Sequence, residues 1–242
     1  MSEKIIAYKA MNPDMTCQGK KYEVGKTYFE DKADCCNAGM HACENPFEVL
    51  RYYPMKDNPR FFEVECGGEI SKSDKGSKLA CTELTVKGEL NFAGMLKATL
   101  DAVFRRVKDK EPFSSGDSST AGTSGNYSTA GTSGYSSTAG TSGYYSTAGT
   151  SGDYSTAGTS GYYSTAAATG PYCRAKAEGN NSIAVANGYK SKVKGSVGCY
   201  LVLTEYDDDG NFLCADLKFV DGISIKADTW YMLKDGLAVE SE

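Results

Sequence analysis

The sequence lacks several features that would indicate catalysis, export or membrane insertion. Its 242 residues include one histidine, one tryptophan and six prolines. No apolar run approaches the roughly 20 residues that cross a bilayer, and the opening segment Met1-Ser-Glu-Lys-Ile-Ile lacks the residue order of a signal peptide. The formal net charge is -5 and lysine and arginine are dispersed, so no basic surface is predicted. We therefore expect a cytoplasmic protein without membrane or nucleic-acid partners.

The nine cysteines are odd in number and irregularly spaced, which favours reduced, half-buried thiols over a disulfide framework. Cys35, Cys36, His41 and Cys43 form a cluster of metal-ligand residue types. Thiolate and imidazole are ligands of tetrahedral zinc, but the spacing matches no standard zinc motif and adjacent cysteines rarely share one metal. We expect no metal and no other cofactor. The alternative to a zinc site is a loop in which His41 and Cys43 pack under a helix.

A glycine recurs at every ninth position between Gly116 and Gly188, framing copies of the unit x-Tyr-Ser-Thr-Ala-Gly-Thr-Ser-Gly. One unit is too short to bury a core, so neighbouring units must stack in a solenoid. Two nonads would close a coil of about 18 residues, with the glycines at corners that need a positive φ. Calcium-binding rolls of this period need a recurring aspartate. Only Asp117 and Asp153 stand in the first place of a nonad, so we expect no calcium in the repeats.

Charged residues in the later nonads indicate which places face outward. The fourth and sixth places there hold Arg174, Lys176, Lys192 and Lys194, and an unpaired charge is costly to bury. The third, fifth and seventh places then face inward, which predicts a thin interior of small residues such as Ser146, Ala148 and Thr150. The outward threonines and corner tyrosines would form a regular contact surface; alternatively, the tyrosines only shield the corners by stacking. The candidate surface residues are Tyr127, Tyr145, Tyr154, Tyr163, Tyr172, Thr129, Thr147 and Thr156.

We predict three regions: an α+β domain at 1–110, the nonapeptide-repeat β-solenoid at 111–198, and a C-terminal β cap at 199–242 with two hairpins. Alternating residues suggest strands at 5–8 and 60–66, the second ended by Gly67-Gly68.

Two helices are predicted in the first region. The first runs from Pro46 to Tyr52, with Asn45 as its N-cap and Glu48 in the position that completes a capping box. The second is amphipathic, with apolar residues from Phe92 to Val107. Because it directly precedes the repeats, we expect it to cover the open edge of the first coil.

The last nonads resemble a known repeat. Asn181-Ser-Ile-Ala-Val-Ala-Asn-Gly188 and Tyr189-Lys-Ser-Lys-Val-Lys-Gly195 are similar to the head repeat of YadA-like trimeric adhesins, which form a left-handed β-roll. This resemblance implies a homotrimer in which Ile183 and Val185, outward but apolar, face a neighbouring subunit. The alternative is that both pack beneath the C-terminal cap.

A broader resemblance covers nearly the whole chain. Tyr22-Glu-Val-Gly-Lys-Thr-Tyr28, Gly39-Met-His-Ala-Cys-Glu-Asn-Pro46, Arg51-Tyr-Tyr-Pro54, Gly198-Cys-Tyr-Leu-Val-Leu203 and Ala227-Asp-Thr-Trp-Tyr231 resemble a group of uncharacterised phage and prophage proteins. The resemblance implies a phage setting, within the bacterial host or in the virion, and no established activity.

The order of strand, Gly39-Met-His-Ala, helix and strand also resembles ADP-ribosyltransferase-like folds. Catalysis there needs an arginine or histidine on the first strand and a glutamate that activates the acceptor. Here the first strand offers Tyr8 and Lys9, and Glu63 or Glu65 would be the acid. The alternative is that both glutamates are ordinary edge-strand carboxylates.

The sequence therefore favours a non-enzymatic phage or prophage protein, structural or interacting, that displays a repetitive Tyr/Thr surface as an oligomer. A second hypothesis is an inhibitor or sponge in which the first domain captures a host defence protein or a small ligand. An ADP-ribosyltransferase-like enzyme ranks last.

Overall fold

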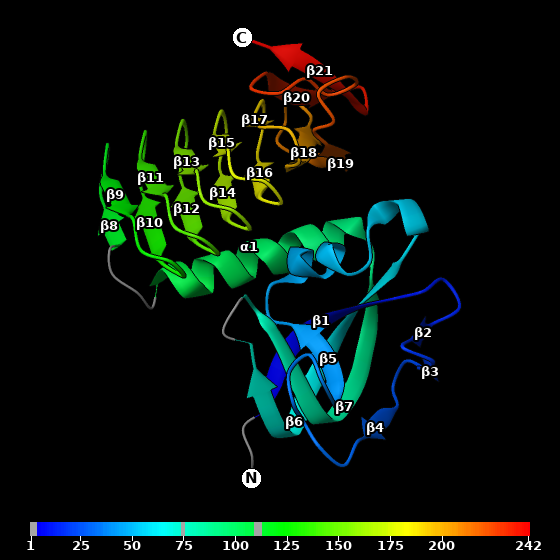
Figure 1. The fold of residues 1–242 in the computed structure, drawn as a ribbon. Coiled ribbons are helices and arrows are strands. Elements are labelled where there is room, and N and C mark those ends of the chain that lie inside the picture. The colour runs from blue at the N-terminus through cyan, green and yellow to red at the C-terminus, as the bar shows by residue number, and fades with distance from the viewer. Residues whose placement is uncertain (1–3, 74–75, 109–112) are drawn as a thin grey trace. The chain divides into compact units, whose positions relative to one another are not determined.

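The computed structural model describes residues 4–73, 76–108 and 113–242 (Figure 1). The chain divides into two compact units, the first ending at Ala102 and the second beginning at Val103. The predicted fold class is confirmed: an α+β unit precedes a β-solenoid of about 5 coils between residues 113 and 202. In the described residues no helix combines the length and the hydropathy needed to span a bilayer.

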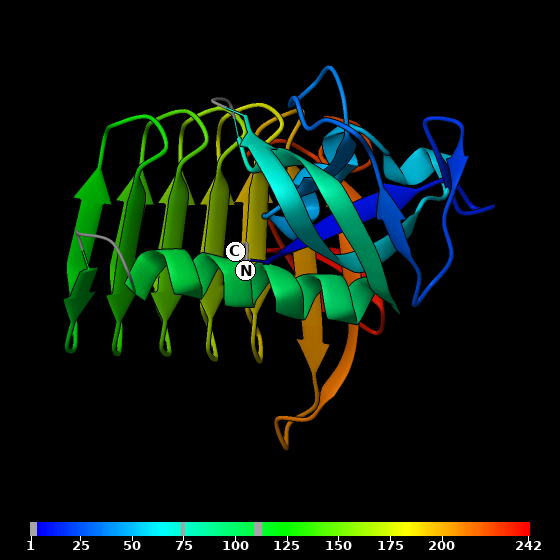
Figure 2. The same ribbon diagram turned by 90° about the horizontal axis from the view of Figure 1, so that it is seen from below.

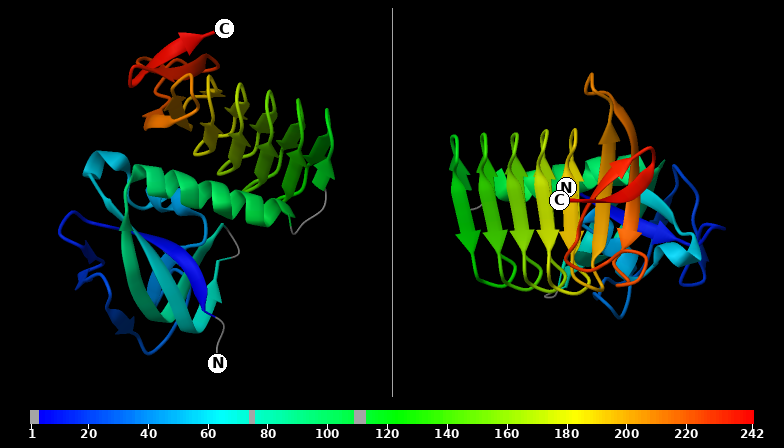
Figure 3. Two further views of the ribbon diagram at one scale, coloured as in Figure 1. Left: turned by 180° about the vertical axis from the view of Figure 1, so that it is seen from behind. Right: turned by 90° about the horizontal axis from the view of Figure 1, so that it is seen from above.

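The first unit is a curled β-sheet (Figure 3, left). Its strands follow the order β4-β7-β5-β1-β6, and β7 also pairs with β6, so the sheet closes on itself. The bounds are Ile5–Met11 for β1, Thr27–Phe29 for β4, Met40–Cys43 for β5, Arg60–Lys72 for β6 and Lys78–Leu90 for β7, and a separate hairpin pairs β2 (Thr16–Cys17) with β3 (Lys20–Lys21). Large apolar side chains are fully buried in this sheet, among them Met11, Phe62, Val64, Leu79, Leu84 and Val86.

The predicted end of the second strand was wrong. β6 continues through Gly67-Gly68 to Lys72, because its pairing with β7 shifts register between Gly67 and Ile70 instead of stopping. Gly68 lies in this irregularity with a φ of 72°. A β-bulge of this kind absorbs a residue and lets the strand go on. The sequence pattern also missed β7, the long partner strand.

The short helix is a 3-10 helix, η1, at Pro46–Arg51, and it is followed by η2 at Met55–Asp57. The predicted capping box does not form. Asn45 makes no side-chain cap hydrogen bond, and Glu48 Oε2 instead accepts a hydrogen bond from the Ser77 backbone N–H at 2.9 Å. A long-range partner thus replaces the local one.

Helix α1 spans Phe92–Lys108, as its apolar spacing predicted. Met95, Leu96 and Leu100 are buried. Thr99 is also buried and donates its hydroxyl hydrogen bond to the Met95 carbonyl one turn earlier. That α1 covers the first coil stays a prediction.

Two parallel sheets form the solenoid, and each coil contributes one strand to each sheet (Figure 2). One sheet contains β8 (Phe113–Ser115), β10 (Thr129–Ser133), β12 (Thr147–Ser151), β14 (Thr165–Thr169) and β16 (Ile183–Asn187); the other contains β9 (Thr120–Thr123), β11 (Thr138–Thr141), β13 (Thr156–Thr159), β15 (Arg174–Ala177) and β17 (Lys192–Gly195). Thr129 pairs with Thr147 and Thr138 with Thr156, which confirms the coil of two nonads.

The C-terminal strands continue both sheets at one end of the stack (Figure 3, right). β18 (Tyr200–Tyr206) pairs in parallel with β16 and antiparallel with β19 (Phe212–Phe219), while β20 (Trp230–Lys234) pairs antiparallel with β17 and with β21 (Leu237–Ser241). The interior cluster is shared: it runs from the repeat alanines to Leu201, Leu203, Tyr231 and Leu233. Larger side chains thus replace alanine where the repeats end.

Burial confirms the predicted inward places of the repeats. Ser146, Ala148 and Thr150 are fully buried. The interior serines also connect the coils: the Ser146 N–H donates to Ser164 Oγ at 3.1 Å, and Ser164 Oγ donates to the Gly143 carbonyl at 3.1 Å. Serine at this place therefore fixes each corner to the coil before it.

The positive φ predicted for the corner glycines is found at alternate corners only. A positive φ occurs at Gly116, Gly134, Gly152 and Gly170 but not at Gly125, Gly143, Gly161 or Gly179. What most of them share is a close approach: a β-carbon added at Gly161 would lie 1.9 Å from the Gly143 carbonyl oxygen. The left-handed conformation lies two residues later, where tyrosines such as Tyr145 and Tyr154 have φ values of 55° and 56°.

Candidate functional site

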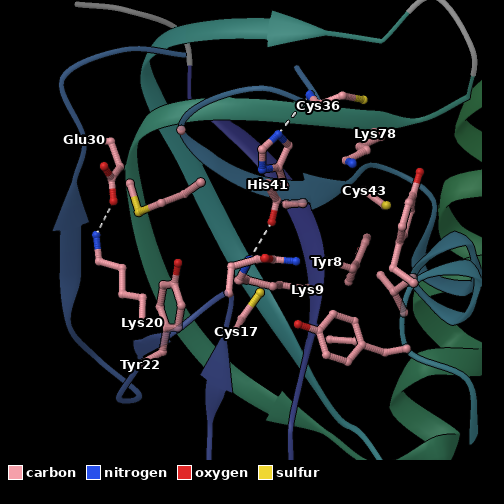
Figure 4. A pocket seen from close by; sticks show the side chains of 18 of the residues that line it. Tyr8, Lys9, Cys17, Lys20, Tyr22, Glu30, Cys36, His41, Cys43 and Lys78 are labelled. Atoms are coloured by element: carbon pink, nitrogen blue, oxygen red, sulfur yellow. Dashed lines mark hydrogen bonds and ion pairs between the residues drawn. The ribbon is translucent and has the colours of Figure 1, made fainter. Parts of the chain in front are cut away.

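The first unit contains a cavity of about 450 Å³ (Figure 4). Its lining comes from β1, β5, the β2–β3 hairpin, η1 and the start of β7. Small-molecule sites in proteins have volumes of ~300–1,000 Å³, so the cavity is large enough for a metabolite.

Cations dominate the charge of this lining. Among the described residues it contains Lys9, Lys20 and Lys78 but only one carboxylate, Glu30. Glu30 is committed to Lys20, with its Oε1 atom 2.6 Å from Lys20 Nζ. Lys9 is 5% exposed, and its Nζ donates a hydrogen bond to the His41 carbonyl at 2.8 Å. No carboxylate of the described residues lies within 4.0 Å of Lys9 Nζ or Lys78 Nζ.

Aromatic rings stand beside these ammonium groups. Lys9 Nζ lies 5.1 Å from the ring centroid of Tyr22, and Lys78 Nζ lies 4.5 Å from that of Tyr52; Tyr8 and Tyr53 also line the cavity. Burial raises the pKa of Tyr52 to about 12 and raises the pKa values of Tyr22 and Tyr53 further. These phenols therefore keep their protons at neutral pH and remain hydrogen-bond donors.

His41 stands in the same lining on β5. Its Nε2 accepts a hydrogen bond from the Cys36 backbone N–H at 3.0 Å, which leaves Nδ1 to carry the proton of the neutral ring. Burial, then the charges of Lys78 and Lys9, lower the pKa of His41 from its ordinary value. The ring is therefore neutral at physiological pH and held in one orientation.

The structure places the four residues of the possible zinc cluster near one another without converging their ligand atoms. Cys35 Sγ and Cys36 Sγ lie 3.9 Å apart, and Cys35 Sγ points to the Lys78 carbonyl at 3.8 Å. Cys43 is buried in β5, and burial raises the pKa of its thiol. In the described part of the chain no three His, Cys, Asp or Glu side chains are arranged to hold a metal. The protein's freedom from metal and cofactors stays a prediction.

The residues of the enzyme hypothesis do not all line the cavity, although Glu63 lies opposite Tyr8 in the pairing of β1 with β6. Tyr8 and Lys9 line the cavity, but Glu63 and Glu65 do not. Glu65 instead forms ion pairs with Lys4 at 2.8 Å and with Lys87 at 3.7 Å. Side chains alternate along β6: Phe62 and Val64 point to the buried face, so Glu63 and Glu65 point to the opposite face.

Sequence reasoning considered Lys9 only as a first-strand residue of the enzyme hypothesis, and it missed Lys78, Tyr22 and Tyr52. One signal was present in the sequence: Lys9 is the only charged residue of the strand Ile5–Met11, whose last five residues, Lys9 included, are buried. A lysine inside such a strand is rarely buried without a reason. Lys78 and Tyr52 could not be found, because neither β7 nor the loop after η1 was assigned to this site.

The corner tyrosines form columns along the solenoid. At one corner Tyr127, Tyr145 and Tyr163 stack with centroid distances of 5.4 and 5.1 Å, beside a second stacked pair, Tyr144 and Tyr162, at 5.4 Å. The other corner carries what we call the tyrosine row, Tyr135, Tyr154, Tyr172 and Tyr189, in which successive centroids lie 5.3, 4.9 and 5.7 Å apart. At the first corner the rings lie face to face, whereas in the tyrosine row only Tyr154 and Tyr172 do so; Tyr135 is tilted by 52° against Tyr154, and Tyr189 meets Tyr172 edge-on.

Two threonines of the candidate surface are buried in the single chain. Thr129 and Thr147 are 5% and 4% exposed, while Thr156, in the other sheet, is half-buried. The alternation that points these side chains away from the interior holds. The two sheets differ instead in their outer faces, one buried and one accessible.

Ile183 and Val185 lie on the buried outer face. Their neighbours Ala184 and Ala186 belong to the interior cluster, as predicted, but Ile183 and Val185 are themselves 6% and 0% exposed in the single chain. That a second subunit contacts them stays a prediction. The homotrimer and the role of Ile183 and Val185 in it both stay predictions.

Comparison with known proteins identifies one matching segment. Residues 5–98 match a family described as a domain of unknown function (DUF7666). The segment contains every residue that lines the cavity and ends before the repeats. No curated protein and no solved structure shows significant similarity to the chain.

Proposed function

We propose that the chain is a non-enzymatic interaction protein, in the phage or prophage setting that its sequence resemblance implies, and that it self-associates through the tyrosine row. Exposure supports this proposal. Tyr135, Tyr154 and Tyr172 keep 52%, 49% and 39% of their surface exposed although their rings contact one another. Tyrosine offers a large contact area at low conformational entropy and keeps a polar tip.

The regular spacing of the row points to a second copy of this chain as the partner. The row advances by one ring per coil, because the coils stack in register, although Tyr135 and Tyr189 stand in the first place of their nonads and Tyr154 and Tyr172 in the second. A surface with a fixed repeat is complementary to a surface with the same repeat, and the solenoid of another copy has it. Closed homo-oligomers are the commonest outcome of such self-complementary surfaces.

Light scattering at tens of micromolar tests the proposal. The variant Tyr154→Ser with Tyr172→Ser removes two rings but keeps a residue that the chain already uses there, since Ser118 and Ser136 take the same left-handed conformation in earlier coils. We expect the wild type to be oligomeric and the variant monomeric, with unchanged unfolding.

The matched control is Tyr144→Asn with Tyr162→Asn at the other corner, where Asn126 and Asn180 hold the same place in neighbouring coils. It should leave the oligomer intact. A monomeric wild type, or an equal effect of both double variants, would show that the row only shields its corner.

A further inference from the structure

Four cations lie together on the outer face of the sheet that contains β15 and β17 (Figure 1). The two strands pair in parallel and in register, with Arg174 opposite Lys192 and Lys176 opposite Lys194. The residues between these cations belong to the interior cluster, so alternation points the cations to the accessible outer face. We call these four residues the cationic patch. They are dispersed along the chain, and the coil of two nonads brings them together.

The surface beside the patch is open on the side of the earlier coils. At the places of the cations, β13 has Thr156 and Gly158, and β11 and β9 repeat threonine and glycine there. Thr120 and Thr138 are exposed. An extended ligand that lies across the patch therefore meets no bulky side chain on the outer face of these strands.

Two cations of the patch already have a partner. Lys176 forms an ion pair with Glu178, a partly exposed contact of the kind that contributes little to stability. Lys192 donates a hydrogen bond to the main-chain oxygen of Glu242. Like charges on adjacent strands repel each other, so an anionic ligand over the patch would relieve this repulsion.

The other two cations, Arg174 and Lys194, form no ion pair in the described part of the chain. Both contact Trp230 instead: the guanidinium carbon lies 5.8 Å and the ammonium nitrogen 4.9 Å from its ring centroid. Trp230 stands on the same outer face, because its neighbour Tyr231 pairs with Val193 and belongs to the interior cluster. The patch therefore combines positive charge with an indole ring.

A single nucleic-acid strand has the chemistry that matches this patch. Alternate residues along a strand lie about 6.6 Å apart, which is comparable to the separation of successive phosphates in an extended nucleic acid. Lysine and arginine bind phosphate by charge-assisted hydrogen bonds. Proteins that bind single strands combine such a cationic surface with aromatic side chains near the bases. A duplex keeps its bases paired and cannot place them beside the indole.

We propose that the cationic patch binds single-stranded nucleic acid, with phosphates at its four cations and bases beside Trp230. The patch shares no residue with the tyrosine row or with the cavity of the first unit. Self-association and nucleic-acid binding can therefore fail independently.

Fluorescence titration with an oligodeoxythymidylate of about 12 nucleotides tests the patch. Trp230 is the sole tryptophan and contacts two of the four cations, so its emission should change as the strand binds. The anisotropy of a labelled strand gives a second readout. The logarithm of the binding constant should fall with the logarithm of the salt concentration with a slope of about −2.8, because each neutralised phosphate of a single strand contributes about −0.7.

A double variant restores the earlier repeat at two places of the patch. Arg174→Thr with Lys192→Thr introduces the residue that Thr156 represents in the preceding coil, so the fold should be kept. We expect the affinity to fall at least tenfold and the salt slope to fall to about −1.4. The control is Lys218→Thr with Lys226→Thr, which removes the same charge from two lysines of the second unit outside the patch. Its affinity and salt slope should equal those of the wild type.

Three results would overturn the proposal. The first is an unchanged Trp230 emission and an unchanged anisotropy at about 0.1 mM strand and low salt, the weak end of non-specific binding. The second is an equal loss of affinity in both double variants, which would mean attraction by net charge alone. The third is binding of a sulfated polysaccharide or of phosphatidylglycerol vesicles at least as tight as that of the strand, which would mean that the patch recognises another kind of anionic surface.

Discussion

The two units of this protein fill their interiors in opposite ways. In the solenoid almost every inward place holds a small residue, and corner backbones approach so closely that a β-carbon at Gly161 would lie 1.9 Å from a carbonyl oxygen. In the first unit side chains as different as Ala7 and Phe62 share one core, and a buried lysine borders a cavity of about 450 Å³. A repeated interior gives each coil the same surroundings. A unique binding site therefore needs the irregular unit, while the repetitive unit offers a regular outer surface.

The sharpest way to break this comparison is to insert one methyl group where the coils touch. We expect Gly161→Ala to lower the free energy of unfolding of the second unit by at least about 2 kcal/mol. The added carbon meets the Gly143 backbone, and one coil cannot move away without breaking its hydrogen bonds to the next. Trp230, the sole tryptophan, lies in this unit, so its fluorescence during urea unfolding reports the change.

Gly158→Ala is the matched control. It belongs to the same nonad, and an added β-carbon there meets nothing within 4 Å. Its unfolding midpoint should stay near that of the wild type or rise slightly. If the two alanine variants unfold alike, the close approach of the corners is not what fixes glycine at the ninth place.

A second change tests whether the uniform interior is optimal. Thr150 is fully buried, and its Oγ1 atom has no hydrogen-bond partner in the described part of the chain. Replacing this hydroxyl by a methyl group removes the cost of burying an unsatisfied polar atom. We expect Thr150→Val to raise the free energy of unfolding of the second unit by about 1 kcal/mol, measured by Trp230 fluorescence.

Thr156→Val provides the reference, because Thr156 faces outward and is only half-buried. The free energy of unfolding of this variant should hardly differ from that of the wild type. A loss of stability in Thr150→Val would mean that the interior hydroxyl is bonded and that threonine belongs to the packing. The repetitive unit would then be as specifically packed as the irregular one.

The two units also differ in what their sequence could reveal. The nonad predicted the coil and its inward places, because each place of the unit is repeated many times and single deviating residues do not hide the pattern. It could not predict that the outer face with Thr147 and Val185 is buried while the one with Thr156 is accessible. The two sheets repeat the same nonad, so the nonad contains no signal for that difference.

In the first unit the sequence found the elements with strong local signals and missed those set by distant partners. Helix α1 followed from its spacing, but β7 and the bulge beyond Gly67 are defined by pairing between strands. The candidate site shares this origin. Lys9 and Lys78 belong to strands β1 and β7, which do not pair with each other and meet the cavity through β5 between them.

The smallest expected effect concerns pH and separates the units once more. Burial and the charges of Lys78 and Lys9 lower the pKa of His41 below its ordinary value of 6.5. The unfolded chain therefore takes up this proton at a higher pH than the folded chain does. As a result the first unit should lose stability as the pH falls from about 6.5 to the folded pKa. The second unit contains no histidine, so Trp230 should report the same unfolding midpoint over this range.

An NMR titration of the single imidazole measures the cause directly. We expect a His41 pKa below 6.5 in the wild type and a higher value in Lys78→Gln, because one of the two repelling charges is gone. Hydrogen exchange of the β5 amides should show the matching loss of protection as the pH falls, and His41→Gln should abolish it. A wild-type pKa at or above 6.5 would mean that the lysines do not face this ring, and the positive charge assigned to the cavity would be misplaced.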